Sequence, residues 1–365
     1  PALSYGQACP TNSPSSNITT SPGSLSLLPA MDQGGTGLCY AFTISQLADA
    51  RRYINPANRQ KRISPLALGM LTPQKSDYLK RSRLDDGGSV KGALETLMKP
   101  GNPICDQKYV SRLYGSTDDQ FTAFGTMELM FKQIREAYYT PCNCTPAKRR
   151  QEALNSISGM RTYMTSPNLL EGLPSENVNG FLADLATIII KMNDLPPTAF
   201  ANYNESFNSR LLVPYFTRMC RGNTVSVPPL KLSGLRSGDH DLNSGLTSVP
   251  SNQQVKRFSD HAWSILSQSG AQPVGVNFCS AMLTGTSSFV SPAIGDSRCG
   301  HHAAVLAGQR CKAGKRQFLL RNSWGQNCGD QLAARHRPNC DGKGNVWVDG
   351  ESLMLSAYSL YQTVP

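Results

Sequence analysis

The stretch MDQGGTGLCYAF, Met31 to Phe42, places one cysteine directly after a glycine-rich loop. Glycine loses more conformational entropy than other residues in a helix or strand, so the loop is predicted to be irregular. The next residues, AFTISQLADARRYI, have apolar side chains at helical spacing and arginines near the end, which suits a helix C-terminus. Cys39 is therefore predicted to begin a helix, where backbone N–H groups and the helix dipole favour a thiolate. A structural cysteine buried behind a tight turn is the alternative for this stretch alone.

Length and composition predict a globular protein with a substantial core. The 365 residues can form one large domain or two ordinary ones, and 39% of them are hydrophobic. The most apolar segment, residues 182–192, is shorter than the run of about 18 residues that a membrane span needs and is predicted to be a buried helix. Because the chain begins at Pro1 with no signal-like stretch, we expect a mature or trimmed form.

The net charge of +11 favours acidic surroundings, such as an anionic surface or polymer. The basic residues are scattered, which fits a solvated face better than a binding patch. No nucleic-acid module is recognisable, so we expect no specific nucleic-acid partner.

The cysteine count indicates an oxidising compartment. Of eleven cysteines, ten remain when Cys39 is set aside, and an even remainder plus one free thiol is typical of an exported enzyme. We therefore expect a secreted or periplasmic protein with disulfide bonds. Pairing cannot be read from sequence, although Cys328 and Cys340 flank a loop and are a plausible pair.

The distribution of patterns along the chain predicts an α+β architecture. The first thirty residues are expected to be irregular, residues 116–192 mostly helical, and residues 195–252 loop-like. In the last part a helix is predicted for FSDHAWSILSQSG, and strands for QPVGVNF, HHAAVLAGQR, KRQFLLRNSWG and GNVWVDGESLM. Helices early and strands late suggest two parts that face each other.

A nucleophilic cysteine needs a base, and two histidines open a predicted strand. Neighbours in a strand point to opposite faces, so only one of His301 and His302 can face a cleft. At the end of the next strand Asn322 is placed to accept a hydrogen bond from the imidazole, and Trp324 to shield that bond from water. Taken singly, each residue fits an ordinary structural role equally well.

The order of the cysteine loop, the histidine strand and NSWG resembles the papain-like cysteine protease family. The positions that match its cysteine segment are Gln33, Gly34, Gly37, Cys39, Ala41 and Phe42. HAAVLAG resembles the family's histidine strand, NSWG its asparagine loop, and DDGG at 85–88 its glycine wall. The resemblance covers roughly residues 26–112 and 253–355.

The resemblance implies a role for each matched residue. Cys39 would be the nucleophile and His302 the general base and then acid, so that the two can form a thiolate–imidazolium pair. Asn322 would orient His302, Gln33 would donate to the oxyanion, and Trp324 would cover the His–Asn contact.

The family's substrate-binding positions carry small or apolar residues here. Gly87 and Gly88 would hold substrate backbone, while Val90, Gly300 and Ala303 would line the pocket for the second residue before the cut. A protein or peptide substrate with a hydrophobic side chain at that position is expected.

The chain also departs from the family. Thr36 replaces a cysteine that ties down the loop, Leu38 replaces a small residue, and Cys328 takes the place of a second tryptophan. The separation of 263 between Cys39 and His302 exceeds the usual 130–150 by more than a hundred residues. We expect an irregular arm (1–25), a helical half with the nucleophile (26–115), a mostly helical insertion (116–252), and a β-barrel-like half with His and Asn (253–365).

Three alternatives accompany this prediction of a cysteine endopeptidase. The same fold serves exopeptidases and transpeptidases, and a non-catalytic binding protein would retain it if Leu38 and the insertion closed the site.

Two cysteine groups, Cys142 with Cys144 and Cys299 with His301 and His302, contain metal-ligating residue types. A disulfide is the preferred interpretation of the first, and we expect no metal and no cofactor.

Overall fold

The fold is described from a computed structural model. It describes Cys9, scattered positions between 145 and 183, and residues 15–20, 22–72, 87–116, 118–125, 212–236, 251–285, 299–328 and 332–365. Across those ranges, no helix has the length and apolar character that crossing a membrane requires.

The chain folds into two compact units. The first comprises residues 1–60, 87–98 and 227–365, and the second comprises residues 61–86 and 99–226. All the residues predicted to carry chemistry belong to the first unit. The segment boundaries expected at 26, 116 and 253 stay a prediction, because most of residues 116–252 lie outside the described part of the chain.

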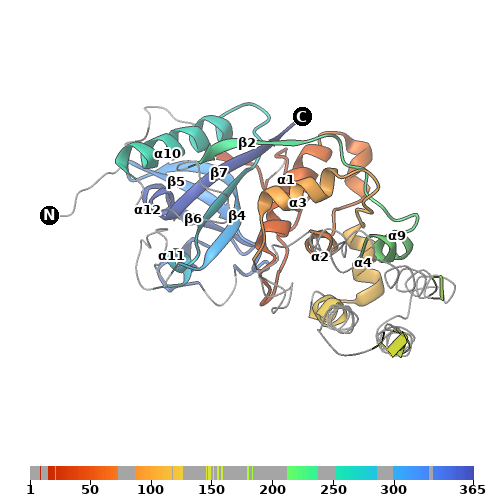
Figure 1. The fold of residues 1–365 in the computed structure, drawn as a ribbon. Helices are drawn as coiled ribbons and strands as arrows, with labels where there is room; N and C mark the ends of the chain where they lie inside the picture. The colour runs from red at the N-terminus through yellow and green to blue at the C-terminus, as the bar shows by residue number, and fades with distance from the viewer. Residues whose placement is uncertain are drawn as a thin grey trace. The chain divides into compact units, whose positions relative to one another are not determined.

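An antiparallel sheet forms the centre of the first unit (Figure 1). Its strands are β1 (Ser16–Asn17), β2 (Lys231–Arg236), β3 (Val274–Cys279), β4 (His301–Lys312), β5 (Lys315–Arg321), β6 (Asn345–Asp349) and β7 (Ala357–Val364). They run in the order β2-β7-β3-β4-β5-β6, and β1 pairs with β4. The strands predicted in QPVGVNF, HHAAVLAGQR and KRQFLLR are confirmed, as is the combination of helices with a sheet. A barrel-like closure stays a prediction.

The predicted strand GNVWVDGESLM was partly wrong. It divides into β6 and the helix α12 (Gly350–Ser356). Asp349 ends the strand and caps the helix, because its Oδ1 accepts a hydrogen bond of 2.9 Å from the backbone N–H of Ser352.

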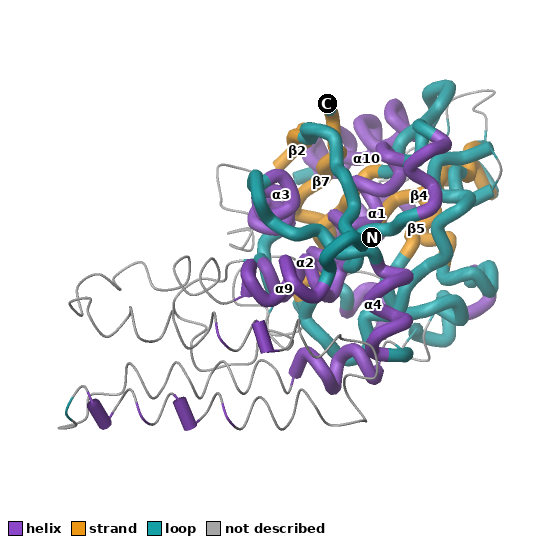
Figure 2. The backbone as a smooth tube through the Cα atoms, turned by 90° about the vertical axis from the view of Figure 1, so that its right-hand side faces the viewer, coloured by secondary structure: helices purple, strands orange, loops and turns teal. Residues whose placement is uncertain are grey.

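Helices cover both faces of this sheet (Figure 2). The helices of the first unit are α1 (Cys39–Arg52), η1 (Pro56–Gln60), α3 (Val90–Met98), α10 (Asn252–Leu266), α11 (Ala281–Thr284), η5 (Arg337–Asn339) and α12. On one face, Val276 and Phe278 of β3 pack into a core shared with α10 and α12. On the other face, the Thr363 hydroxyl of β7 donates to the carbonyl of Leu47 in α1. The sheet therefore holds β4 directly against α1, the contact on which the candidate site depends.

The N-terminal stretch is more ordered than its composition suggested. Ser16 and Asn17 form β1, and a Cys9–Cys311 disulfide attaches the chain before it to the end of β4. Leu25 and Leu28 are buried, and both of their carbonyls accept hydrogen bonds from the buried Arg321 guanidinium. Burial of these few apolar side chains outweighs a polar composition that by itself favours turns.

The second unit contains α2 (Pro65–Leu71), α4 (Gln107–Tyr114) and α9 (Val213–Met219). A Cys105–Cys220 disulfide joins its distant segments, and the buried hydroxyls of Tyr114 and Tyr215 lie 2.7 Å apart. Both α9 and β2 fall within residues 195–252, which were expected to be loop-like. Most of the helices expected in residues 116–192, and the pair Cys142 and Cys144, lie outside the described residues.

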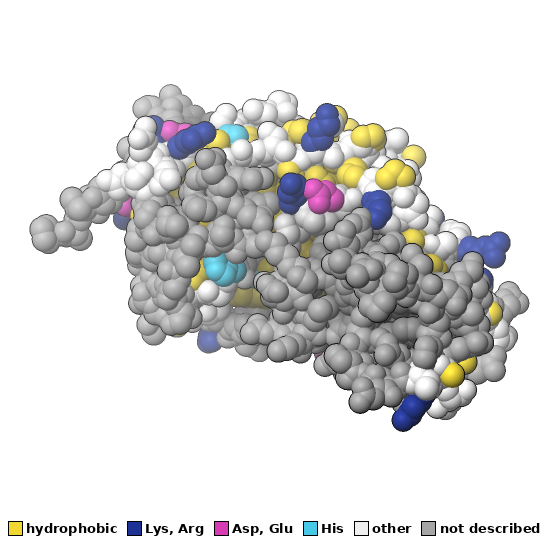
Figure 3. All heavy atoms as spheres, in the orientation of Figure 1, with side chains coloured by type: hydrophobic (Ala, Val, Ile, Leu, Met, Phe, Trp, Pro, Cys, Tyr) yellow, Lys and Arg dark blue, Asp and Glu magenta, His cyan; other side chains and the backbone are white. Residues whose placement is uncertain are grey.

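The charged residues do not form one patch on the face shown in Figure 3, where the Lys and Arg side chains of the described residues stand apart from one another.

Candidate active site

Cys39 is the first residue of α1, as the glycine loop predicted. Gly34 has a left-handed φ of 58°, a conformation that glycine adopts without steric cost. The N-cap residue Leu38 offers no side-chain acceptor, so no side chain competes for the N–H groups of the first turn. The sulfur instead faces the backbone N–H groups of Ala303, Tyr40 and Cys39 itself.

Burial governs the charge state of this thiol. Cys39 is 8% exposed, and it is the free cysteine among the described residues. Desolvation raises the pKa of the thiol to about 11, although the three N–H groups act in the opposite direction. The N–H groups at the helix start favour the thiolate as expected, but desolvation by burial acts more strongly in the opposite direction.

His302 is the second residue of β4, and one nitrogen of its ring is hydrogen-bonded to an asparagine side chain. Its Nε2 lies 2.7 Å from Oδ1 of Asn322, the residue that follows β5. Burial lowers the pKa of the imidazole to about 4, while the bond to Asn322 raises it. The neighbouring His301 is exposed and places its ring edge-on to Tyr358 at 5.3 Å. With Nε2 occupied, Nδ1 is the ring nitrogen left to exchange a proton with a thiol.

Trp324 lies against the histidine, with ring centroids 5.4 Å apart. A backbone bridge between Trp324 and Asp32 connects the asparagine loop to the cysteine loop. The ring of Phe278 is edge-on to His302 at 5.6 Å. Two aromatic rings therefore pack against the imidazole, which is itself buried.

Gln33 is held by both ends of its amide. Its Oε1 accepts a short hydrogen bond from the hydroxyl of Ser323, and its Nε2 donates to the carbonyl of Thr36 at 2.6 Å. The hydroxyl of Thr36 donates back to the carbonyl of Gln33 at 2.8 Å. These two hydrogen bonds between Gln33 and Thr36 close the cysteine loop. They lie at the residue, Thr36, that replaces the disulfide cysteine of the papain-like family. A primary amide has two N–H donors, so one remains for another acceptor.

The residues predicted to bind substrate lie in different environments. Gly87 is exposed, whereas Val90 and Ala303 are buried at 2% and 3%. A Cβ on Gly88 would collide with the ring of Tyr40, and this close approach explains the glycine. On Gly300, which is exposed, a Cβ would lie 2.8 Å from the hydroxyl of Ser280.

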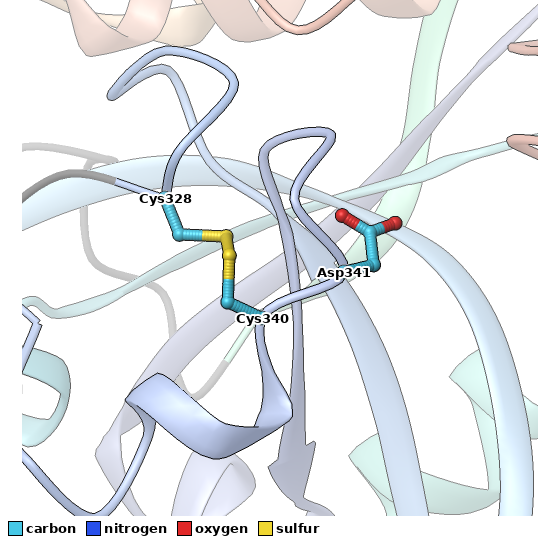
Figure 4. A group of neighbouring side chains, drawn as sticks. All are labelled: Cys328, Cys340 and Asp341. Atoms are coloured by element: carbon cyan, nitrogen blue, oxygen red, sulfur yellow. A yellow bond between two sulfur atoms is a disulfide. The ribbon is translucent and has the colours of Figure 1, made fainter.

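The cysteine groups considered as metal ligands are explained by disulfides where the structure describes them. Cys299 is bonded to Cys279, so its sulfur is not a thiolate ligand. Cys328 and Cys340, the pair suggested by sequence, form a disulfide next to Asp341 (Figure 4). A carboxylate oxygen of Asp341 lies within 4.8 Å of both sulfurs, and the carboxylate accepts hydrogen bonds from its own loop.

Two residues near the site were missed by the sequence reasoning. Ser323 binds the side chain of Gln33, and its place in NSWG was the available signal. Tyr358 is buried. Desolvation is the main cause that raises the pKa of its phenol, and the charge of the nearby Cys39 adds to it. No sequence motif marks Tyr358.

No protein-family model and no curated protein matches the sequence. Among solved structures, one from work on the mite allergens Blo t 1 and Der p 1 is 14% identical, with a TM-score of 0.42, and the match covers 100% of this chain and 74% of that chain. PepW from Lactobacillus rhamnosus HN001 is 11% identical, with a TM-score of 0.33. That match covers 92% of this chain and 79% of the PepW chain. Likeness at this level does not determine the activity, which has to be argued from the site.

Proposed function

We propose that this protein is a papain-like cysteine endopeptidase. The observation that carries the proposal is the meeting of α1 and β4. The Cys39 sulfur lies against the backbone N–H of Ala303, the residue after His302, and the far nitrogen of His302 is bound to Asn322 at 2.7 Å. These contacts, together with the position of the matched cysteine, histidine, asparagine and glutamine in the same compact unit, support the proposal.

The reaction would begin from a neutral pair, because burial leaves both the thiol and the imidazole uncharged near pH 7. As the sulfur of Cys39 attacks the scissile carbonyl carbon, His302 accepts the thiol proton. The oxygen that becomes negative is stabilised by the remaining N–H of Gln33 and by the backbone N–H of Cys39. His302 then protonates the leaving amine, and water hydrolyses the thioester with His302 again acting as base.

Substrate selection is proposed to follow the small and apolar positions. Gly87 and Gly88 hold the substrate backbone, and Val90, Gly300 and Ala303 form a pocket that accepts Val, Leu or Phe. The four disulfides of the described residues support action in a secreted or periplasmic setting.

The test is cleavage of a fluorogenic peptide library by the wild-type chain, Cys39→Ser, His302→Ala and the matched control His301→Ala. We expect cleavage after a hydrophobic second residue, a loss of on the order of 10³-fold or more in the first two variants, and near wild-type rates in the control. A thiol-directed epoxide should modify Cys39, as shown by peptide mass mapping.

Cleavage that persists in Cys39→Ser would refute the proposal. Absence of cleavage together with a Cys39 that reacts only after unfolding would identify a closed site, as expected of a non-catalytic binding protein. Products of one or two residues from a long peptide would indicate an exopeptidase.

A further inference from the structure

The strand that carries His302 is fastened at its first residues. The Cys279–Cys299 disulfide joins the last residue of β3 to the chain two residues before β4 begins at His301. Cys279 itself pairs with His301 in the sheet. The covalent link therefore lies three residues from His302, at the end of a strand. Backbone hydrogen bonds between strands open most easily at such an end.

A second set of contacts holds the residue between the disulfide and the strand. The carbonyl of Gly300 accepts two hydrogen bonds from Ser280, one from its backbone N–H at 2.8 Å and one from its hydroxyl at 3.0 Å. The approach is so close that a Cβ on Gly300 would lie 2.8 Å from the hydroxyl of Ser280. We call the disulfide and these two bonds the β3–β4 clamp.

The candidate site needs such a constraint. The bond to Asn322 holds Nε2 of His302 through the side chain, whereas the position of the residue itself is set by the backbone of β4. The same backbone supplies the N–H of Ala303 that faces the Cys39 sulfur. A shift of residues 301–303 would therefore move the base and the thiol's hydrogen-bond donor together.

We propose that the β3–β4 clamp is a positioning element that sets the placement of His302 relative to Cys39, an inference that rests on the proposed peptidase function. Its members act through His302 and do not touch the reacting atoms. The clamp also makes the site sensitive to thiol reductants. A dithiol that exchanges with the disulfide releases Cys279 and Cys299 as thiols, becomes a disulfide itself, and leaves Cys39 in its thiol form.

The test compares Cys279→Ala/Cys299→Ala with the control Cys9→Ala/Cys311→Ala, which removes the disulfide at the opposite end of β4. Two quantities are measured: the pH midpoint of the His302 ring by NMR, and kcat and KM for a cleaved peptide. In the clamp variant we expect the midpoint to rise from about 4 towards 6.5, because the ring becomes hydrated. We expect kcat to fall by on the order of tenfold to a hundredfold.

The control should leave the His302 midpoint and kcat at wild-type values. An unchanged midpoint and an unchanged kcat in the clamp variant would overturn the inference. If that variant does not fold, Ser280→Ala decides, with an expected fall in kcat of about two- to tenfold and a midpoint shift in the same direction. If the wild type cleaves no peptide, the peptidase proposal fails, but the His302 midpoint still tests the clamp.

Discussion

The burial of His302 predicts a specific loss of stability in acid. Its pKa is about 4 in the folded protein against 6.5 for an ordinary imidazole, so the folded state binds fewer protons than the unfolded state between these values. The stabilising contribution is complete above about pH 6.5 and is lost as the pH falls through the folded value. At about 1.4 kcal/mol per pKa unit, a drop from pH 7.5 to pH 4 removes about 3 kcal/mol.

The assay is chemical unfolding of the wild type and of His302→Gln at the two pH values, followed by far-UV circular dichroism. The variant also loses the bond to Asn322, but it does so at both pH values, so that loss cancels in the comparison. Three other histidines (His261, His301 and His336) also have lowered pKa values, and they are present in both proteins. We expect the wild type to lose about 3 kcal/mol more than the variant between the two pH values.

Equal losses in the two proteins would mean that His302 is hydrated and titrates normally. The description of His302 as a buried imidazole packed against Trp324 and Phe278 would then be incorrect.

Three further variants test separate contacts. Asn322→Ala removes a buried hydrogen bond to the base, so kcat/KM in a peptide assay should fall by about 5- to 150-fold, corresponding to about 1–3 kcal/mol; an unchanged value would exclude an orienting role. Gln33→Ala removes one oxyanion donor and should reduce kcat by about 10²–10³ at nearly constant KM, whereas an effect on KM alone would indicate ground-state binding. Asp49→Ala removes the 2.5 Å ion pair that this carboxylate forms with the buried Arg52 in α1, so unfolding should show a loss of about 3–5 kcal/mol. The exposed Glu95→Ala is its control and should change stability by less than about 0.5 kcal/mol, because its partner is hydrated.

Local patterns were sufficient to predict the elements that carry the site. The helix after Cys39 followed from apolar spacing and from the glycines before it, and β3, β4 and β5 from short apolar runs. The position of Asn322 at the end of a predicted strand also led us to expect a hydrogen bond to the imidazole. The structure shows this bond between Asn322 Oδ1 and His302 Nε2 at 2.7 Å. These features depend on residues close in sequence or on neighbouring antiparallel strands, where register follows from the chain itself.

Long-range contacts could not be predicted in the same way. Cys9 and Cys311 are separated by 302 positions and Cys105 and Cys220 by 115, and many pairings of ten cysteines are compatible with one sequence. The binding of the Leu25 carbonyl by a buried arginine belongs to the same class, because neither segment carries a pattern that identifies the other. Such contacts gave the N-terminal stretch an order that its polar composition did not indicate.

The charge state of the site depends on burial, which sequence does not report. Moving a proton from a thiol with a pKa of about 11 to an imidazole with a pKa of about 4 costs about 10 kcal/mol before the two charges interact. Two unit charges about 4 Å apart gain only about 4 kcal/mol at an effective dielectric constant of about 20. The neutral pair therefore prevails at rest, and the proton has to move as the carbon–sulfur bond forms. For that reason the placement of His302, and not the resting charge of Cys39, is what the surrounding contacts have to secure.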